Sequence, residues 1–127
     1  MSEGKVFLID DDPATLQLYT KALENAGFQV YATSQVIGTV NKINEFSPDV
    51  ILLDVMMPAL AGDKIVKILR QSVRSQPTII LLSNKGEEEL NKIAKECGAD
   101  DFITKMSGPL SVVRKINEHI FRKKGRA

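Results

Sequence analysis

The chain has 127 residues, of which 43% are apolar and 26% charged, and its formal net charge is +1. This length fits one domain with a buried core, and the near-zero charge excludes a global field that would attract nucleic acid or membrane. No apolar run approaches the roughly 20 residues of a membrane span, residues 1–5 show no signal peptide, and Cys97 is the only cysteine. We therefore expect a cytoplasmic domain that has no intrachain disulfide and contacts neither nucleic acid nor membrane.

Five short apolar runs alternate with longer stretches of helical periodicity. The runs have the length and composition of buried strands, and they comprise residues 6–9, 28–31, 50–53, 78–82 and 101–104. The third run ends at Asp54, and the turn-forming residues Pro58 and Gly62 follow it. This order predicts a strand, a loop and then a helix, with a carboxylate at the end of the strand.

Capping residues mark where the intervening helices begin and end. The first helix is expected from Asp12, a good N-cap, to Gly27, and Ser34 is expected to cap the second. The other three are expected from about residue 63 to 73, from 87 to 98, and from 108 onward. The apolar faces predicted for the first, second, third and fifth helices are Leu16, Tyr19, Leu23 and Ala26; Ile37, Val40, Ile43 and Phe46; Ile65, Val66, Ile68 and Leu69; and Leu110, Val113, Ile116 and Ile120.

The alternation βαβαβαβαβα predicts a parallel sheet with helices on both faces. Right-handed crossovers leave few topologies, and the doubly wound, flavodoxin-like order 2-1-3-4-5 fits this length. The predicted fold class is therefore α/β, a three-layer (βα)5 sandwich. We expect residues 1–121 to form the domain and residues 122–127 to form a basic tail or the start of a linker.

Polar residues follow four of the predicted strands and meet at one edge of the sheet. The first strand is followed by Asp10 and Asp11, the third ends at Asp54, and the fourth and fifth lead to Ser83 and Lys105. Three carboxylates in one pocket repel each other and need a cation, and hard oxygen ligands beside a loop suit Mg²⁺. Asp54 could then act as a nucleophile that accepts a phosphoryl group. Mg²⁺ and Lys105 would neutralise the phosphoryl oxygens, and the Ser83 hydroxyl would donate a hydrogen bond to one of them.

These residues resemble a response-regulator receiver domain of two-component signalling over nearly the whole chain, from about residue 5 to 121. The motifs that carry the resemblance are Leu8-Ile9-Asp10-Asp11-Asp12-Pro13, Asp54-Val55-Met56-Met57-Pro58 with Gly62, Ser83 after Ile79-Ile80-Leu81-Leu82, and Gly98-Ala99-Asp100-Asp101-Phe102-Ile103-Thr104-Lys105. The resemblance implies that Asp54 is phosphorylated by a histidine kinase or a phosphotransfer protein, and that the chain is not a turnover enzyme.

The resemblance also implies roles for the remaining site residues. Asp10, Asp11, Asp54 and the Met56 carbonyl would serve the magnesium site, while Ser83 and Phe102 would form a switch pair. Phosphorylation would alter the face made by the fourth helix, fifth strand and fifth helix, where a downstream effector or a second copy of the chain could bind. Across such a dimer, we expect Asp100 and Asp101 to pair with Arg114 or Lys115.

Two residues depart from the family pattern. Met106 follows Lys105 where the family usually has proline, and a cis bond without proline costs about 2.5–4 kcal/mol, so we expect a trans bond or local strain. Asn84 follows Ser83 where the family usually has a smaller residue. Its side chain is expected to narrow the access to Asp54 and to slow phosphorylation.

Several of these residues also have a simpler interpretation. Asp12 is expected to be only a helix cap, and Phe102 could be a core residue without a switch role. His119 is expected to be solvated, and Cys97 to be a packing residue at a helix end.

Two other functions compete with the phosphorylated switch. One is a phosphorylation-independent interaction module on the same fold, which Asn84 and Met106 would favour. The other is a magnesium-dependent phosphatase, which needs a second acid on the loop of the nucleophile, whereas no acid follows Asp54 before Asp63. A flavin-binding domain shares the fold class, but no Ser/Thr/Gly-rich phosphate loop follows the first strand.

Overall fold

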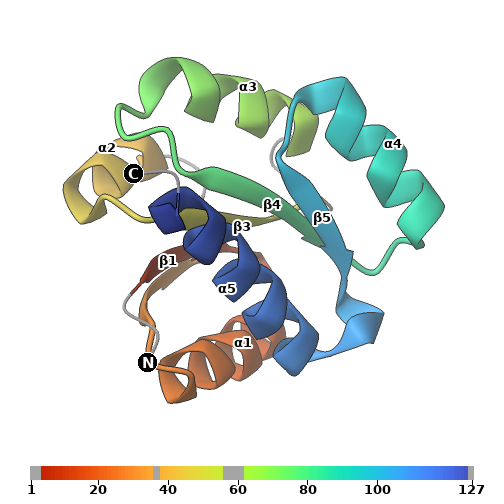
Figure 1. The fold of residues 1–127 in the computed structure, drawn as a ribbon. Helices are drawn as coiled ribbons and strands as arrows, with labels where there is room; N and C mark the ends of the chain where they lie inside the picture. The colour runs from red at the N-terminus through yellow and green to blue at the C-terminus, as the bar shows by residue number, and fades with distance from the viewer. Residues whose placement is uncertain (1–3, 36–37, 56–61, 126–127) are drawn as a thin grey trace.

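A single parallel sheet forms the centre of the computed structural model, which describes residues 4–35, 38–55 and 62–125. Its strands are β1 (Lys5–Ile9), β2 (Gln29–Thr33), β3 (Val50–Asp54), β4 (Thr78–Ser83) and β5 (Asp101–Thr104). They pair in the order β2-β1-β3-β4-β5, and every pairing is parallel. The predicted doubly wound α/β fold and its strand order are therefore confirmed (Figure 1).

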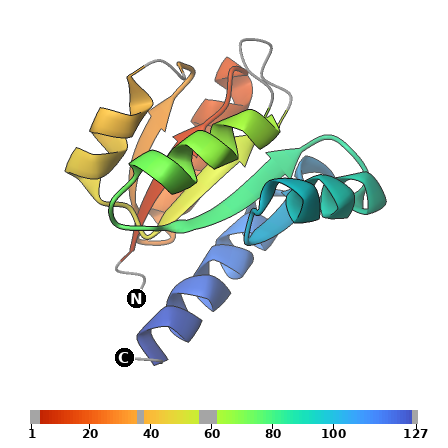
Figure 2. The ribbon, with the colours of Figure 1, turned by 90° about the horizontal axis from the view of Figure 1, so that it is seen from above.

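The helices cover both faces of this sheet. They are α1 (Pro13–Asn25), α2 (Thr39–Phe46), α3 (Gly62–Ser72), α4 (Glu87–Cys97) and α5 (Pro109–Gly125), and a short 3-10 helix spans Lys105–Ser107. Helices α1 and α5 lie on one face, and α2, α3 and α4 lie on the other (Figures 1 and 2). None of the helices in the described ranges combines the length and the apolar character needed to cross a bilayer.

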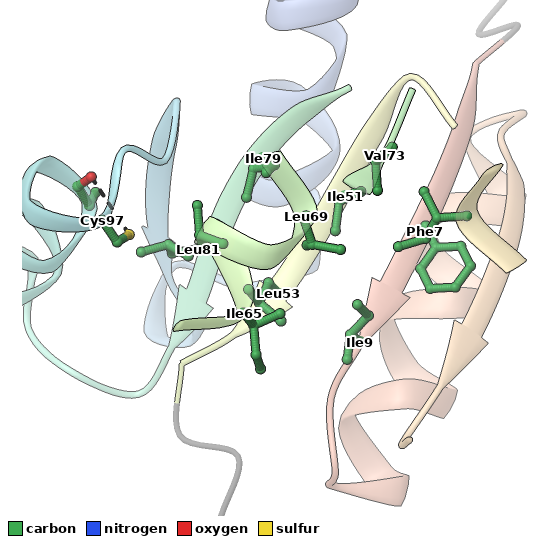
Figure 3. Packing of buried hydrophobic residues seen from close by; sticks show 13 residues of the cluster. Phe7, Ile9, Ile51, Leu53, Ile65, Leu69, Val73, Ile79, Leu81 and Cys97 are labelled. Carbon is green, nitrogen blue, oxygen red and sulfur yellow. Dashed lines mark hydrogen bonds between the residues drawn. The ribbon is translucent and has the colours of Figure 1, made fainter. Parts of the chain in front are cut away.

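Strict alternation along the central strands divides the core into two clusters. In β1, β3 and β4 the odd-numbered apolar residues face α2, α3 and α4, and the even-numbered ones face α1 and α5. The first cluster includes Phe7, Ile51, Leu69 and Cys97 (Figure 3). Both faces of these strands are therefore buried, which explains why their sequences read as continuous apolar runs rather than as alternating ones.

Two helix starts differ in how well the sequence predicted them. Asp12 caps α1 as expected, because its Oδ1 accepts a hydrogen bond from the Ala14 N–H at 3.1 Å. The prediction that Ser34 caps the second helix is wrong, since α2 begins at Thr39 after Gly38. Gly38 has φ 81°, and a left-handed residue at this position cannot belong to a right-handed helix that begins before it.

Two residues predicted to face the core are exposed instead. Ile68 on α3 is 43% exposed and Leu110 on α5 is 76% exposed. The buried apolar residues are Ile65, Val66 and Leu69 in α3, and Val112, Ile116 and Ile120 in α5. At about 100° per residue, Ile68 lies about 105° and Leu110 about 120° from the centre of the buried face of its helix, so both fall outside it.

Candidate functional site

Three aspartates meet where β1 and β3 end. The register pairs Ile9 with Leu53, so the next residues, Asp10 and Asp54, leave the two strands at the same level. One carboxylate oxygen from each of Asp10, Asp11 and Asp54 lies within 4.8 Å of the others. Asp10 and Asp54 are buried, whereas Asp11 is exposed. The cluster therefore opens to solvent on the side of Asp11.

The local chain and Lys105 each contact one oxygen of the Asp10 carboxylate. Its Oδ1 accepts a hydrogen bond from the Asp12 N–H at 2.9 Å. Its Oδ2 is fully buried and lies 2.8 Å from the Lys105 Nζ. A buried carboxylate oxygen beside two further carboxylates is a donor set that suits a hard divalent cation. The residues present therefore fit the magnesium site that the sequence predicts.

Lys105 supplies the positive charge of the site. It follows β5, and its Nζ lies 2.8 Å from Oδ2 of Asp10 and 3.7 Å from Oδ2 of Asp54. The contact with Asp10 is a buried ion pair. Burial acts to lower the pKa of Lys105, but contact with Asp10 and the nearby charges of Asp54 and Asp12 outweigh it, so the pKa is raised. The ammonium group therefore keeps its charge at neutral pH.

Ser83 and Phe102, the predicted switch pair, lie in different environments. Ser83 is buried at the end of β4, where its hydroxyl oxygen accepts a hydrogen bond from the Lys85 N–H at 3.2 Å. Phe102 is only partly buried, and the Nζ of Lys115 lies 5.7 Å from the centre of its ring. The switch roles of these two residues stay predictions.

The residues that depart from the family pattern lie at the surface. Asn84 is exposed in the loop that follows β4, and the Met106 side chain is 74% exposed. No peptide bond within the described ranges is cis, so Lys105 and Met106 are joined by a trans bond, as expected. The influence of Asn84 and Met106 on access to Asp54 stays a prediction. Met56, whose carbonyl is predicted to bind the metal, lies outside the described residues.

Two α1 residues that the sequence analysis did not assign to the site contact Lys105. Thr15 Oγ1 accepts a hydrogen bond from the Lys105 Nζ at 3.5 Å, and the Tyr19 hydroxyl donates one to the Lys105 carbonyl oxygen at 3.4 Å. Burial is the main cause that raises the pKa of Tyr19, which therefore remains a donor. Thr15 and Tyr19 lie four residues apart, shortly after the N-cap Asp12, so both lie on the same face of α1. This spacing is the signal in the sequence that could have placed them at the site.

The prediction that His119 is solvated is wrong. Its side chain is only 14% exposed, and its Nε2 lies 2.8 Å from Oδ2 of Asp101. Lys115 Nζ lies 3.1 Å from Oδ1 of the same carboxylate. The one-turn spacing of Lys115 and His119 on α5 brings both to β5, an arrangement that the polar neighbours of His119 in the sequence did not reveal.

The acids suggested for a dimer contact have partners within the chain. Asp101 contacts Lys115 and His119, and Asp100 Oδ2 lies 2.7 Å from an Arg70 guanidinium nitrogen. Pairing across a dimer would have to break or share these contacts.

Cys97 is buried at the end of α4, which confirms its packing role. Residues 122–125 continue α5, while residues 126–127 lie outside the described ranges, so the tail stays a prediction.

Comparison with known proteins decides the family. The family model for the response regulator receiver domain matches residues 6–117, which include the aspartates and Lys105. The chain belongs to the response regulator receiver family. This receiver domain is 34% identical to the phosphate regulon transcriptional regulatory protein PhoB of Escherichia coli over 113 residues, covering 88% of this chain and 49% of the relative. It is 35% identical to the alkaline phosphatase synthesis transcriptional regulatory protein PhoP of Bacillus subtilis, covering 88% and 46%.

Solved receiver structures show the same fold. The chemotaxis response regulator CheY4 of Vibrio cholerae has a TM-score of 0.81 at 26% identity and covers 93% of this chain and 99% of that chain. The Francisella response regulator 1452 receiver domain has a TM-score of 0.83 at 28% identity, covering 94% and 98%. The chain spans about half the length of the curated relatives it matches and nearly all of these receiver structures.

Proposed function

We propose that Asp54 accepts a phosphoryl group from a histidine kinase or a histidine phosphotransfer protein. The observation that carries the proposal is the placement of the Asp54 carboxylate at the end of β3, within 4.8 Å of two further carboxylates and 3.7 Å from an ammonium group. Phosphoryl transfer needs mainly positioning and charge neutralisation, and this pocket offers both.

In the proposed reaction an Asp54 oxygen forms a bond to phosphorus while the bond from phosphorus to the donor's imidazole nitrogen breaks. The electron pair of the broken bond stays on that nitrogen, which can then take a proton from water. Lys105 would shift from Asp10 toward the new phosphoryl oxygens. The Ser83 hydroxyl, now an acceptor from the Lys85 N–H, would turn to donate a hydrogen bond to one of them.

Asp10, Asp11 and Asp54 are the residues proposed to hold Mg²⁺, together with the Met56 carbonyl. When bound, the ion supplies positive charge that offsets the growing negative charge on the phosphoryl oxygens. The clustering of the three carboxylates supports this assignment, because three negative charges within 4.8 Å of one another repel, and Lys105 offers only one positive charge to offset them.

The proposed readout is a shift between two states at the face formed by α4, β5 and α5. Ser83 and Phe102 would couple the phosphoryl group to this face, which a downstream effector or a second copy of the chain would recognise. Receiver domains are generally not turnover enzymes, and we propose no turnover of a separate substrate by this chain. Cytoplasmic location is a proposal that family membership supports. The absence of direct contact of this domain with nucleic acid or membrane is a proposal that rests on its net charge of +1. The similar PhoB and PhoP proteins are transcriptional regulators.

Intact mass spectrometry after incubation with acetyl phosphate and Mg²⁺ tests the proposal. We expect an adduct of one phosphoryl group in the wild type and none in Asp54→Asn or in chelator. Asp49→Asn is the matched control. It makes the same substitution in the residue just before β3, at the opposite edge of the sheet, where the Asp49 carboxylate accepts a hydrogen bond from the Lys5 N–H. An adduct that persists in Asp54→Asn would contradict the assignment of the acceptor.

Phosphorylation-independent binding is the competing function, and none of the contacts described above favours it. The test is partner binding by the wild type and by Asp54→Asn, with and without Mg²⁺. Identical binding in all four conditions, together with no phosphoryl adduct, would establish it in place of our proposal.

A further inference from the structure

One face of α1 contacts both the side chain and the main chain of Lys105. Thr15 and Tyr19 lie four residues apart, so they project from the same face of the helix toward β5. Thr15 meets the ammonium nitrogen, at 3.5 Å, and Tyr19 meets the main-chain carbonyl oxygen, at 3.4 Å. These contacts join residues 90 and 86 positions apart in the sequence.

Thr15 is itself fixed by the loop that holds the aspartates. It is 8% exposed, and its hydroxyl donates a hydrogen bond to Oδ2 of Asp12 at 2.8 Å. The Asp12 N–H in turn donates to Oδ1 of Asp10. Because its proton is committed to Asp12, the Thr15 oxygen presents a lone pair, and the Lys105 ammonium group is the donor that faces it.

Tyr19 fixes the other end of the lysine. Its side chain is 3% exposed, within the core cluster that also contains Leu52 and Val112. The Lys105 carbonyl oxygen that its hydroxyl contacts also accepts a hydrogen bond from the Gly108 N–H, at 3.2 Å. The next side chain, Met106, is 74% exposed, so it does not anchor the segment in the core. The buried Tyr19 therefore links the 3-10 segment Lys105–Ser107 to α1 through the hydrogen bond from its hydroxyl.

We propose that Thr15 and Tyr19 are positioning residues that hold Lys105 ready for phosphoryl transfer, an inference that rests on the proposed function. A lysine side chain has a flexible stem of four carbons and many rotamers, so an unrestrained ammonium group must be ordered during the reaction. Prior ordering removes that cost, and small displacements of a charged group reduce a rate strongly. The α1 face thus acts on phosphorylation through Lys105 and not by touching the phosphoryl group.

Two measurements on the full chain test this proposal. The first is the rate at which an amine reagent labels Lys105 in chelator, followed by peptide mass spectrometry and independent of any phosphorylation. The second is the rate of adduct formation with acetyl phosphate and Mg²⁺. Tyr19→Phe and Thr15→Val keep most of the packing volume and remove one hydroxyl each. The matched control is Tyr31→Phe, which removes the hydroxyl of a tyrosine on the far strand β2 that stacks on Phe7.

We expect both variants to label about threefold to tenfold faster and to accept phosphate slower by the same factor, which is the range set by one ordinary hydrogen bond. Thr15→Ser should restore both rates, and Tyr31→Phe should change neither. In a Lys105→Ala background, neither hydroxyl deletion should slow phosphorylation further, because the group being positioned is absent.

Unchanged labelling of Lys105 in both variants would overturn the proposal, and so would an equal slowing of phosphorylation with and without Lys105. Faster labelling combined with no adduct in the wild type would leave the contact established but refute the proposed function, and with it a role in phosphoryl transfer. Faster labelling, slower phosphorylation and rescue by serine together support the inference.

Discussion

The ammonium nitrogen of Lys105 lies 2.8 Å from Oδ2 of Asp10. The same nitrogen lies 3.7 Å from Oδ2 of Asp54, which is 0.9 Å farther. Asp10 is completely buried and Lys105 is 12% exposed, so the pair is shielded from water. In this state the lysine balances the charge of the deepest aspartate, and our proposal requires it to move when a phosphoryl group is added to Asp54.

The first prediction concerns Lys105→Met in chelator. The substitution leaves the buried Asp10 carboxylate without its counter-charge, so we expect a loss of about 3 kcal/mol in the free energy of unfolding at pH 7. The raised pKa of Lys105 means that this contribution is present below pH 10.5 and is lost as pH rises through the folded-state pKa. Urea unfolding at pH 7 measures the loss, and Mg²⁺ should reduce it.

Lys85→Met is the control for this prediction. Lys85 forms an i,i+4 ion pair with Glu89, and the two side chains are 29% and 58% exposed. Such a pair contributes roughly 0.3–0.5 kcal/mol. Equal losses in Lys105→Met and Lys85→Met would show that the contact of Lys105 with Asp10 has no special energetic importance.

A second prediction separates Asp11 from its neighbours. Asp11 is the exposed member of the cluster, and neutralising it relieves repulsion without leaving a buried charge unpaired. We expect Asp11→Asn to melt at the same temperature as the wild type or higher in chelator, and to lose most of the rise that Mg²⁺ produces. Ligand excess of a hundredfold over the dissociation constant stabilises a protein by about 2.7 kcal/mol, so the wild-type rise is measurable by calorimetry.

The outcome that would count against this prediction is a lower melting temperature of Asp11→Asn in chelator. It would mean that the carboxylates do not repel each other in the folded chain. A full response of the variant to Mg²⁺ would instead remove Asp11 from the metal site while leaving the fold and Asp54 untouched.

The sequence predicted the sheet because its signals are local and strong. Continuous apolar runs appear only where both faces of a strand are covered, and β3 and β4 are buried at every position. The start of α2 was missed because it depends on the backbone of Gly38, whose left-handed φ the sequence does not reveal. Leu110 was placed inward because apolar character alone does not show that it falls outside the buried stripe of α5.

The site was predictable in its membership but not in its pairing. Strand order alone brings Asp10, Asp54 and Lys105 to one edge of the sheet. Which carboxylate the lysine prefers depends on its rotamer and on two α1 side chains that approach from a different segment of the chain. Tyr19 was assigned to the core from its spacing, and that is correct for its ring, but its hydroxyl also reaches the end of β5.

A third prediction concerns the end of the sheet opposite the cluster of Asp10, Asp11 and Asp54. Asp100 Oδ2 accepts hydrogen bonds from the Ile79 N–H at 2.8 Å and from Arg70 at 2.7 Å. Asp100→Ala leaves the buried N–H of Ile79 without this acceptor, and we expect it to cost about 2 kcal/mol in urea unfolding. Arg70→Met removes a side chain that is 29% exposed, together with its hydrogen bonds to the Pro77 and Gly98 carbonyl oxygens, and should cost about 1 kcal/mol.

Phosphorylation provides the control for these two variants. Both residues lie at the amino end of β4 and β5, so neither substitution should change the extent of adduct formation once the protein is folded. A larger loss for Arg70→Met than for Asp100→Ala would contradict the view that the unpaired main-chain N–H is the costlier defect.

The last prediction is a pH dependence that arises from Asp101. Burial acts to raise its pKa, but hydrogen bonds from His119, the Phe102 N–H and Lys115 together outweigh burial and lower it below 3.8. Its contribution to stability is therefore present above about pH 3.8 and is lost as pH falls through the lower folded-state pKa. Asp101→Asn should cost about 1 kcal/mol at pH 7, and this difference from the wild type should shrink below pH 3.8.

Urea midpoints of both proteins between pH 3 and 7 measure this difference, and Glu89→Gln is a matched control on the exposed surface of α4. A difference that stays constant down to pH 3 would show that the Asp101 charge does not stabilise the fold. A difference that shrinks would establish that Lys115 and His119 stabilise β5 through the ionised carboxylate. It would also show that the α4-β5-α5 face contains a charged contact within each chain, which any partner at that face must accommodate.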